Sequence, residues 1–387
     1  MTFGQILCLI LALLLVASGW AVSYLCRGRL RWGATILLVL VDGLTLAGFA
    51  LGGRHPGWHW ADWPYLGTLL QVLTVVFMLQ VLLVTLVLLV VLGRWLYRRL
   101  KRPASPVPFD ASRRRLLQRA AIYPALAAGA SLYGEAIERR QLAVRRFDIP
   151  VAALPSQLTG LRIAQLSDVH LGMFYSLTDW RELLERTAAQ QPDLLAITGD
   201  LFDDVKINVA AAGILEEYVD RFPHGIWFCL GNHEHFRNLR QTLRALQATR
   251  VHTLVNSAAP VEGLAPLWVV GADYPMHRPD FAKDKVKYTT QAFTEVPEGA
   301  MTLFLAHHPE FIDDGAAHGA ALTLTGHTHG GQFGLLGLPV FPVFKYTRGL
   351  VQTGDSYGYV HSGNGSWFPC RIGCPPELAI FTLINKE

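Results

Sequence analysis

Cysteine is scarce in this sequence, with five in 387 residues. So few cysteines exclude a small fold held together by a disulfide framework. Charged residues are also few, at 17%, whereas 51% of the residues are hydrophobic, and this balance excludes a disordered or collagen-like chain. The same balance is too apolar for a purely soluble protein, which indicates that part of the chain lies in a membrane.

Acidic residues are nearly missing from the first part of the chain. Residues 1–146 hold 17 Lys and Arg but 5 Asp and Glu, a net charge of +12. The remaining residues hold 17 Lys and Arg and 25 Asp and Glu, a net charge of −8. The overall charge of +4 is therefore an average over two unlike halves. It does not indicate nucleic-acid binding, which needs a basic patch on the folded domain itself, so we expect none.

Long uncharged runs in the first half predict membrane-spanning helices. Residues 3–24 and 65–92 hold no charge, and residues 33–51 hold one, Asp42. At about 1.5 Å per residue, such lengths match a bilayer core of roughly 30 Å. Asp42 is either a functional acid within the membrane or an acid that faces a partner helix or the loops.

A shorter, Ala-rich stretch at 120–134 follows Arg113-Arg114-Arg115, as in a twin-arginine export signal. It is expected to cross as a fourth helix; the alternative is a basic amphipathic helix on the membrane surface. Arg residues concentrate in the first and third loops, which places those loops in the cytoplasm. We therefore expect a multi-pass protein of the inner (cell) membrane, with the C-terminal half outside the cytoplasm if 120–134 crosses.

In the C-terminal half, five predicted strands each end in a polar cluster. The strands are 161–166, 194–198, 226–230, 302–306 and 321–325, and helical patterns at 179–190 and 210–218 separate the first three. Strands that alternate with helices predict an α/β domain, in which ligands bind at the carboxyl ends of the strands.

The clusters contain seven candidate metal ligands. Each short motif alone is a weak signal, but together they supply the number and type of ligands for two divalent cations that share one carboxylate. The candidate ligands are Asp168, His170, Asp200, Asn232, His307, His327 and His329.

The ordered motifs Asp-x-His, Gly-Asp-x-x-Asp, Gly-Asn-His-Glu, His-x-Pro and Gly-His-x-His, spread over residues 161–383, resemble the calcineurin-like metallophosphoesterase superfamily. The glycine-rich run after His327 and the segment Gly363-Asn364-Gly365 look like its branch of membrane-associated bacterial phosphohydrolases. The resemblance implies two mixed β-sheets sandwiched between helices, here in residues 147–387. An α-helical transmembrane region, residues 1–146, would precede them.

The resemblance also implies a role for each candidate residue. Asp168, His170 and His329 would hold one metal, Asn232, His307 and His327 the other, and Asp200 would bridge them. His233 would donate a proton to the leaving oxygen or bind a phosphoryl oxygen, with Asp203 holding its imidazole. A water between the two cations would ionise near neutral pH and attack phosphorus in line. The donor set suits Mn, Fe, Zn, Co or Ni, and the sequence does not choose among them.

The sequence therefore predicts a membrane-anchored phosphoesterase for a phosphomonoester, phosphodiester or pyrophosphate, including a lipid or lipid-linked substrate. One alternative is a cytoplasm-facing phosphodiesterase that acts on a soluble nucleotide. Another is a non-catalytic scaffold or sensor, whose expected mark is a lost ligand, and no ligand position is lost in this sequence.

Two further features leave alternatives open. The apolar segment Phe333–Phe344 is either a lip that contacts lipid or a buried strand, and Cys370 and Cys374 form either a disulfide or two buried thiols.

Overall fold

The computed structural model describes residues 29–52, 136–172, 174–335, 338–339, 344–365 and 370–386, with short pieces between 12 and 22, between 80 and 100, and at 133–134. The chain divides into two compact units, Met1–Ala136 and Ile137–Glu387. This division lies ahead of the boundary predicted at 146, because strand β1 (Ala143–Val151) already belongs to a sheet of the second unit.

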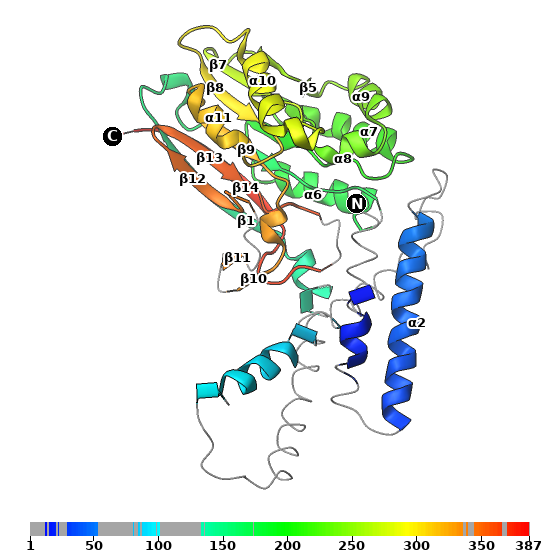
Figure 1. Ribbon diagram of the computed structural model, residues 1–387. Coiled ribbons are helices and arrows are strands. Elements are labelled where there is room, and N and C mark those ends of the chain that lie inside the picture. Colours follow the sequence, from blue (N-terminus) through cyan, green and yellow to red (C-terminus); the bar gives the residue numbers. More distant parts are fainter. Residues whose placement is uncertain are drawn as a thin grey trace. The chain divides into compact units, whose positions relative to one another are not determined.

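The first unit contains helix α2 (Arg29–Gly52), which includes the helix predicted at 33–51 (Figure 1). Asp42 is buried, and its Oδ1 accepts a hydrogen bond of 2.8 Å from Gln80 Nε2, so this acid faces a polar partner within its own unit. No helix within the described part of the chain is long and apolar enough to cross a membrane. The spans predicted at 3–24, 65–92 and 120–134 lie largely outside the described residues.

The second unit is built on two mixed sheets, as predicted, and each of them has six strands. The first sheet has the order β1, β14 (Glu377–Asn385), β2 (Arg162–Leu166), β3 (Leu194–Thr198), β4 (Ile226–Cys229), β5 (His252–Leu254). The second has the order β12 (Gly349–Thr353), β13 (Ser356–Val360), β9 (Leu322–Thr325), β8 (Met301–Leu305), β7 (Leu267–Gly271), β6 (Ser257–Pro260). Strands β2 to β5 run parallel, and so do β13, β9, β8 and β7, so the carboxyl ends of each parallel set lie at one edge.

Helices connect the strands of both sheets. They are α6 (Leu177–Ala188), α7 (Asn208–Tyr218), α8 (Asn232–Phe236), α9 (Leu239–Gln247), α10 (Phe281–Phe293) and α11 (Phe311–Ala317). Short 3-10 helices lie at Glu138–Arg140, Ser156–Leu158, Val219–Arg221, Arg278–Asp280 and His329–Gly331. Figure 1 shows α10 and α11 beside β7, β8 and β9. The helices predicted at 179–190 and 210–218 correspond to α6 and α7.

The local sequence explains where α6 begins. Ser176 is its N-cap: its hydroxyl accepts a hydrogen bond from the amide N–H of Asp179, and the Asp179 carboxylate accepts one from the amide N–H of Ser176. This reciprocal pair satisfies two amide groups that the helix itself leaves without partners. The helix then buries Trp180 completely against the first sheet.

Three apolar layers hold the unit together. Alternate residues of β3 point to opposite faces: Leu195 and Ile197 pack toward α6 and α7, whereas Leu194 and Ala196 pack between the two sheets. Phe304 of β8 packs with the α10 and α11 side of the second sheet. The layers therefore follow the order helices, sheet, sheet, helices, and this arrangement confirms the predicted sandwich.

The structure also bears on the two features for which the sequence left alternatives open, the apolar segment Phe333–Phe344 and the pair Cys370 and Cys374. A separate hairpin, β10 (Gly334–Leu335) with β11 (Leu338–Pro339), occupies part of the apolar segment, and Leu338 is 71% exposed, so it does not lie in a buried strand. Cys370 and Cys374 are both buried, and no disulfide bond joins them.

Candidate metal centre

The predicted ligands lie together because each follows a strand at its carboxyl end. Asp168 and His170 follow β2, Asp200 follows β3, Asn232 begins α8 after β4, His307 follows β8, and His327 and His329 follow β9. These strands belong to both sheets, so the site lies where the carboxyl ends of the two parallel sets meet.

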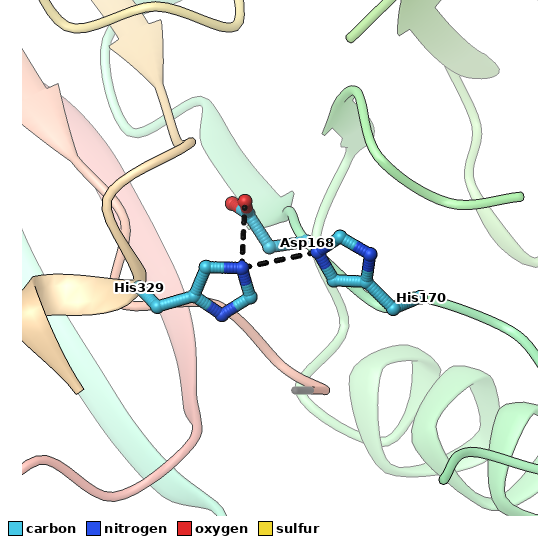
Figure 2. Close-up of side chains that lie close together, drawn as sticks. All are labelled: Asp168, His170 and His329. Carbon is cyan, nitrogen blue, oxygen red and sulfur yellow. Dashed lines mark hydrogen bonds and ion pairs between the residues drawn. The ribbon is translucent and has the colours of Figure 1, made fainter. Parts of the chain in front are cut away.

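Asp168, His170 and His329 form the first group of possible ligands, and their side chains converge on one point (Figure 2). His170 Nε2 lies 3.0 Å from His329 Nε2, and His329 Nε2 lies 3.4 Å from Asp168 Oδ1. All three residues are buried. Two imidazole nitrogens and one carboxylate oxygen at these distances are a donor set for a divalent first-row metal.

Asp200, His307 and His327 form a second group. His307 Nδ1 donates a hydrogen bond of 2.7 Å to the carbonyl oxygen of Thr198, which fixes the ring with Nε2 toward Asp200. His307 Nε2 lies 3.1 Å from Asp200 Oδ2 but has no hydrogen-bond partner, and the buried Asn232 Oδ1 has none either. Such buried atoms cost about 1–3 kcal/mol each unless something binds them, and a cation would satisfy both.

Asp200 lies within reach of both groups. Its Oδ2 is 3.1 Å from His307 Nε2 and 3.8 Å from His170 Nε2. Burial raises the pKa of Asp200, but the charges of His307 and His233 outweigh burial and lower it. Burial likewise lowers the pKa of His307, and the charges of Asp200 and Asp168 outweigh this and raise it to about 10. The same negative charges attract a cation.

The pKa values of His327 and His329 are lowered, whereas that of His307 is raised. Burial lowers the pKa of both imidazoles well below the usual range, and the neighbouring imidazoles, first His307 for His327 and His170 for His329, lower it further. Both rings are therefore neutral at pH 7, and a neutral imidazole is the form that binds a metal.

The backbone is strained at five of the seven predicted ligands. Their φ angles are positive, between 50° and 72°, a region that residues other than glycine rarely adopt. Such strain is concentrated at functional sites, where the surrounding structure holds it in place. The five residues are Asp168, His170, Asp200, His327 and His329.

Glu234 fixes the loop that carries Asp200. Its buried carboxylate accepts hydrogen bonds from the amide N–H groups of Asp200, Leu201, Phe202 and Gly231, at 2.8–3.1 Å. The sequence motif contains Glu234, but no role was predicted for it. Its signal is its position, three residues after the N-cap Gly231, where a glutamate can reach back to that amide group.

His233 and Asp203 lie beside the two groups. His233 Nδ1 is 2.5 Å from Asp203 Oδ1, and the other Asp203 oxygen is 3.2 Å from His170 Nδ1, so one carboxylate orients two imidazoles. Burial lowers the pKa of His233, but the charges of Asp200 and Asp203 raise it to about 9. His170, Asp200 and His233 also offer three ligand atoms close together, so the geometry suits a metal ligand as well as a proton donor at His233.

Several supporting residues have no signal in the local sequence. Arg371 is completely buried, donates to the carbonyl oxygens of Ser362 and Gly365, and places Nη2 3.4 Å from His329 Nδ1. Ser167 Oγ donates to Asp168 Oδ2 at 2.6 Å. These contacts position two predicted ligands. Ser167 directly precedes Asp168 in the sequence, whereas only the folded chain brings Arg371 to His329.

Residues 161–331 match the family of calcineurin-like phosphoesterases. The uncharacterised metallophosphoesterase YkuE of Bacillus subtilis is 27% identical over 290 residues, which cover 70% of this chain and 97% of YkuE. A transmembrane protein with metallophosphoesterase domain of Danio rerio is 29% identical over 61% of this chain, and the match spans 56% of that relative. A solved dimetal phosphatase of Danio rerio shares 10% identity over 53% of this chain and 88% of its own, with a TM-score of 0.32.

The chain therefore contains a calcineurin-like metallophosphoesterase domain, with metallophosphoesterases among its relatives. This family implies hydrolysis of phosphoesters, and the donor groups described above are the residues with which this chain could hold the metals.

Proposed function

We propose that this chain is a phosphoesterase that works with two divalent cations. Asp168, His170 and His329 hold the first cation, and Asn232, His307 and His327 hold the second. The observation that carries this proposal is the place of Asp200, within 3.8 Å of His170 and 3.1 Å of His307, between two groups of possible ligands. The buried oxygen of Asn232 and nitrogen of His307, which have no hydrogen-bond partner, support the same arrangement.

Two cations at this site would supply a hydroxide at neutral pH and neutralise charge on the phosphoryl oxygens. The chain's own residues prepare the proton transfer. Asp203 accepts a hydrogen bond from His233 Nδ1, which fixes the ring and leaves Nε2 to deliver a proton to the leaving oxygen. His233 is also tied to the metal-binding loop, because its amide N–H donates to Asp200 Oδ1 at 2.8 Å.

We further propose that the enzyme is membrane-anchored, with a phosphate ester or pyrophosphate near the bilayer as its substrate, including a lipid or lipid-linked one. The uncharged runs at 3–24 and 65–92 support the anchor, as does the relative named a transmembrane protein. The Arg-rich loops support a catalytic domain outside the cytoplasm of the cell, at the inner membrane.

The replacement Asp200→Asn tests the dinuclear assignment. The variant removes the shared negative charge while keeping the size of the side chain, so we expect metal content and turnover to fall together. Elemental analysis of the purified protein and hydrolysis of 4-nitrophenyl phosphate or its diester measure the two quantities. Two metals per chain with near-normal turnover would contradict the assignment.

A further inference from the structure

The candidate centre opens to solvent at two places. Six of the seven predicted ligands are buried, and the seventh, His327, is partly exposed. His233 and Asp203 are partly exposed as well, with 20% and 16% of their side chains accessible. A substrate therefore reaches the centre past the imidazoles of His233 and His327.

Aromatic rings stand at both places. The ring of Phe236 packs edge-on to His233, with 5.6 Å between the ring centroids. The rings of Tyr274 and Phe344 each lie 5.4 Å from the ring of His327. Apolar surface thus borders each accessible imidazole of the centre.

Phe236 is the most exposed of these three aromatic residues, with 60% of its surface accessible. Within the described part of the second unit, it is the one aromatic residue among the large exposed hydrophobic side chains. It ends α8, the helix that begins with Asn232 and contains His233, so the backbone fixes it beside the predicted proton donor. An exposed aromatic ring at a binding site offers a surface that an apolar ligand can cover.

We infer that Phe236 binds the apolar part of the leaving group, so the preferred substrates are phosphate esters of apolar alcohols, such as aryl or long-chain alkyl groups. This inference rests on the proposed function. The leaving oxygen must lie near His233 Nε2 to receive its proton, and the carbon atoms attached to that oxygen then lie against the adjacent ring.

The neighbouring Arg237 could instead bind the leaving group, through its charge rather than through apolar contact. Its Nε donates to Asp203 Oδ1 at 3.2 Å, and 45% of its side chain is exposed, so it is suited to an anionic or polar leaving group. The ionic partner Asp203 already compensates part of the Arg237 charge, whereas no residue that the structure describes covers most of the Phe236 ring. The apolar leaving group is therefore the occupant that these contacts favour.

The test uses the full-length, metal-loaded protein and a series of phenyl, 4-ethylphenyl and 4-butylphenyl phosphates. Their leaving phenols differ in apolar area but little in acidity, so differences in kcat/KM report binding of the alkyl chain. For the unmodified chain we expect kcat/KM to rise by about two- to fourfold for each added methylene. Phe236→Ala should abolish this rise, and Phe236→Leu should keep most of it.

Two controls complete the design. Leu350→Ala removes an exposed apolar side chain from β12, and the rise with chain length should be unchanged. Arg237→Ala should leave it unchanged as well, and a sugar phosphate should be a poorer substrate than butylphenyl phosphate.

The outcomes separate the two proposals. If the unmodified chain hydrolyses neither these esters nor 4-nitrophenyl phosphate or its diester with any added metal, the proposed function fails. If it hydrolyses them without dependence on chain length, or if Phe236→Ala keeps the dependence, the proposed function stands and the apolar site at Phe236 is overturned. A preference for the sugar phosphate that Arg237→Ala removes would assign leaving-group recognition to Arg237 instead.

Discussion

At the scale of single residues, the geometry of the centre depends on the groups that contact Nδ1 of His170, His233 and His307, the ring nitrogen that points away from the centre. His307 Nδ1 donates to a backbone carbonyl, and Asp203 lies against Nδ1 of both His170 and His233. Each of these contacts fixes a ring so that its Nε2 faces the centre. Asp203 is therefore a positioning residue for one predicted ligand and for the predicted proton donor at the same time.

The replacement His233→Asn separates the two roles that the geometry allows for this residue. As a proton donor, His233 should be dispensable for metal binding, so the variant should keep both metals while turnover falls by about 10²–10⁴-fold. The loss should be smaller for a nitrophenyl ester, whose leaving group needs little protonation, than for an alkyl ester. Metal content and turnover on both kinds of ester measure this.

The control for this prediction is the metal analysis itself. Loss of one metal from His233→Asn would make His233 a ligand, in agreement with its place near His170 and Asp200. An equal loss of rate on both esters would indicate binding of a phosphoryl oxygen rather than proton donation.

The positions of the candidate ligands could be predicted from the sequence, because each follows an apolar run that forms a strand, and the carboxyl ends of parallel strands share an edge. The distant residues that hold these ligands in place could not be predicted from the sequence. Arg371 meets His329, 42 residues away, and Glu234 meets Asp200, 34 residues away. No local pattern encodes such contacts, because they depend on how the loops fold over the finished sheets.

At the scale of secondary-structure elements, glycines let loops from the two sheets approach closely. A methyl group on Gly326, between β9 and His327, would overlap Ser167 Oγ and Asp168 Oδ2. Gly326→Ala should therefore displace Asp168 and lower metal affinity or activity by about 10–100-fold. Metal titration and turnover measure the effect.

Gly213→Ala is the matched control for this replacement. Gly213 lies in α7, and no atom stands within 4 Å of an added methyl group. Alanine favours a helix over glycine, so the variant should keep its metals and gain about 0.5–1 kcal/mol in the free energy of unfolding. Equal loss of metal from both variants would contradict the steric explanation.

The bounds of the strands could be predicted from the sequence, whereas their order in the sheets could not. The five strands that precede the polar clusters were predicted close to their observed bounds, because each is a short apolar run. Strand β14 lies between β1 and β2, parallel to one and antiparallel to the other, and Ala379 pairs with Gln165. A partner more than 200 residues away leaves no mark on the local pattern of β14, so its place in the sheet is visible only in the structure.

At the scale of the whole molecule, the chain joins a basic N-terminal region to an acidic metallophosphoesterase domain. Four membrane spans beginning outside the cytoplasm would put that domain outside as well. Alkaline phosphatase fused after Glu387 should therefore be active, and a fluorescent reporter that matures only in the cytoplasm should stay dark at the same position. The opposite pattern would place the domain in the cytoplasm and favour a soluble nucleotide as the substrate.

The proposed mechanism requires two metals that share Asp200. Diffraction from crystals of the metal-loaded protein, recorded at the absorption edge of the bound metal, tests it most directly. We predict two anomalous peaks about 3.5–4 Å apart, one against Asp168, His170 and His329 and the other against Asn232, His307 and His327, with Asp200 between them. A single peak at full metal loading, or two peaks that Asp200 does not touch, would contradict the account.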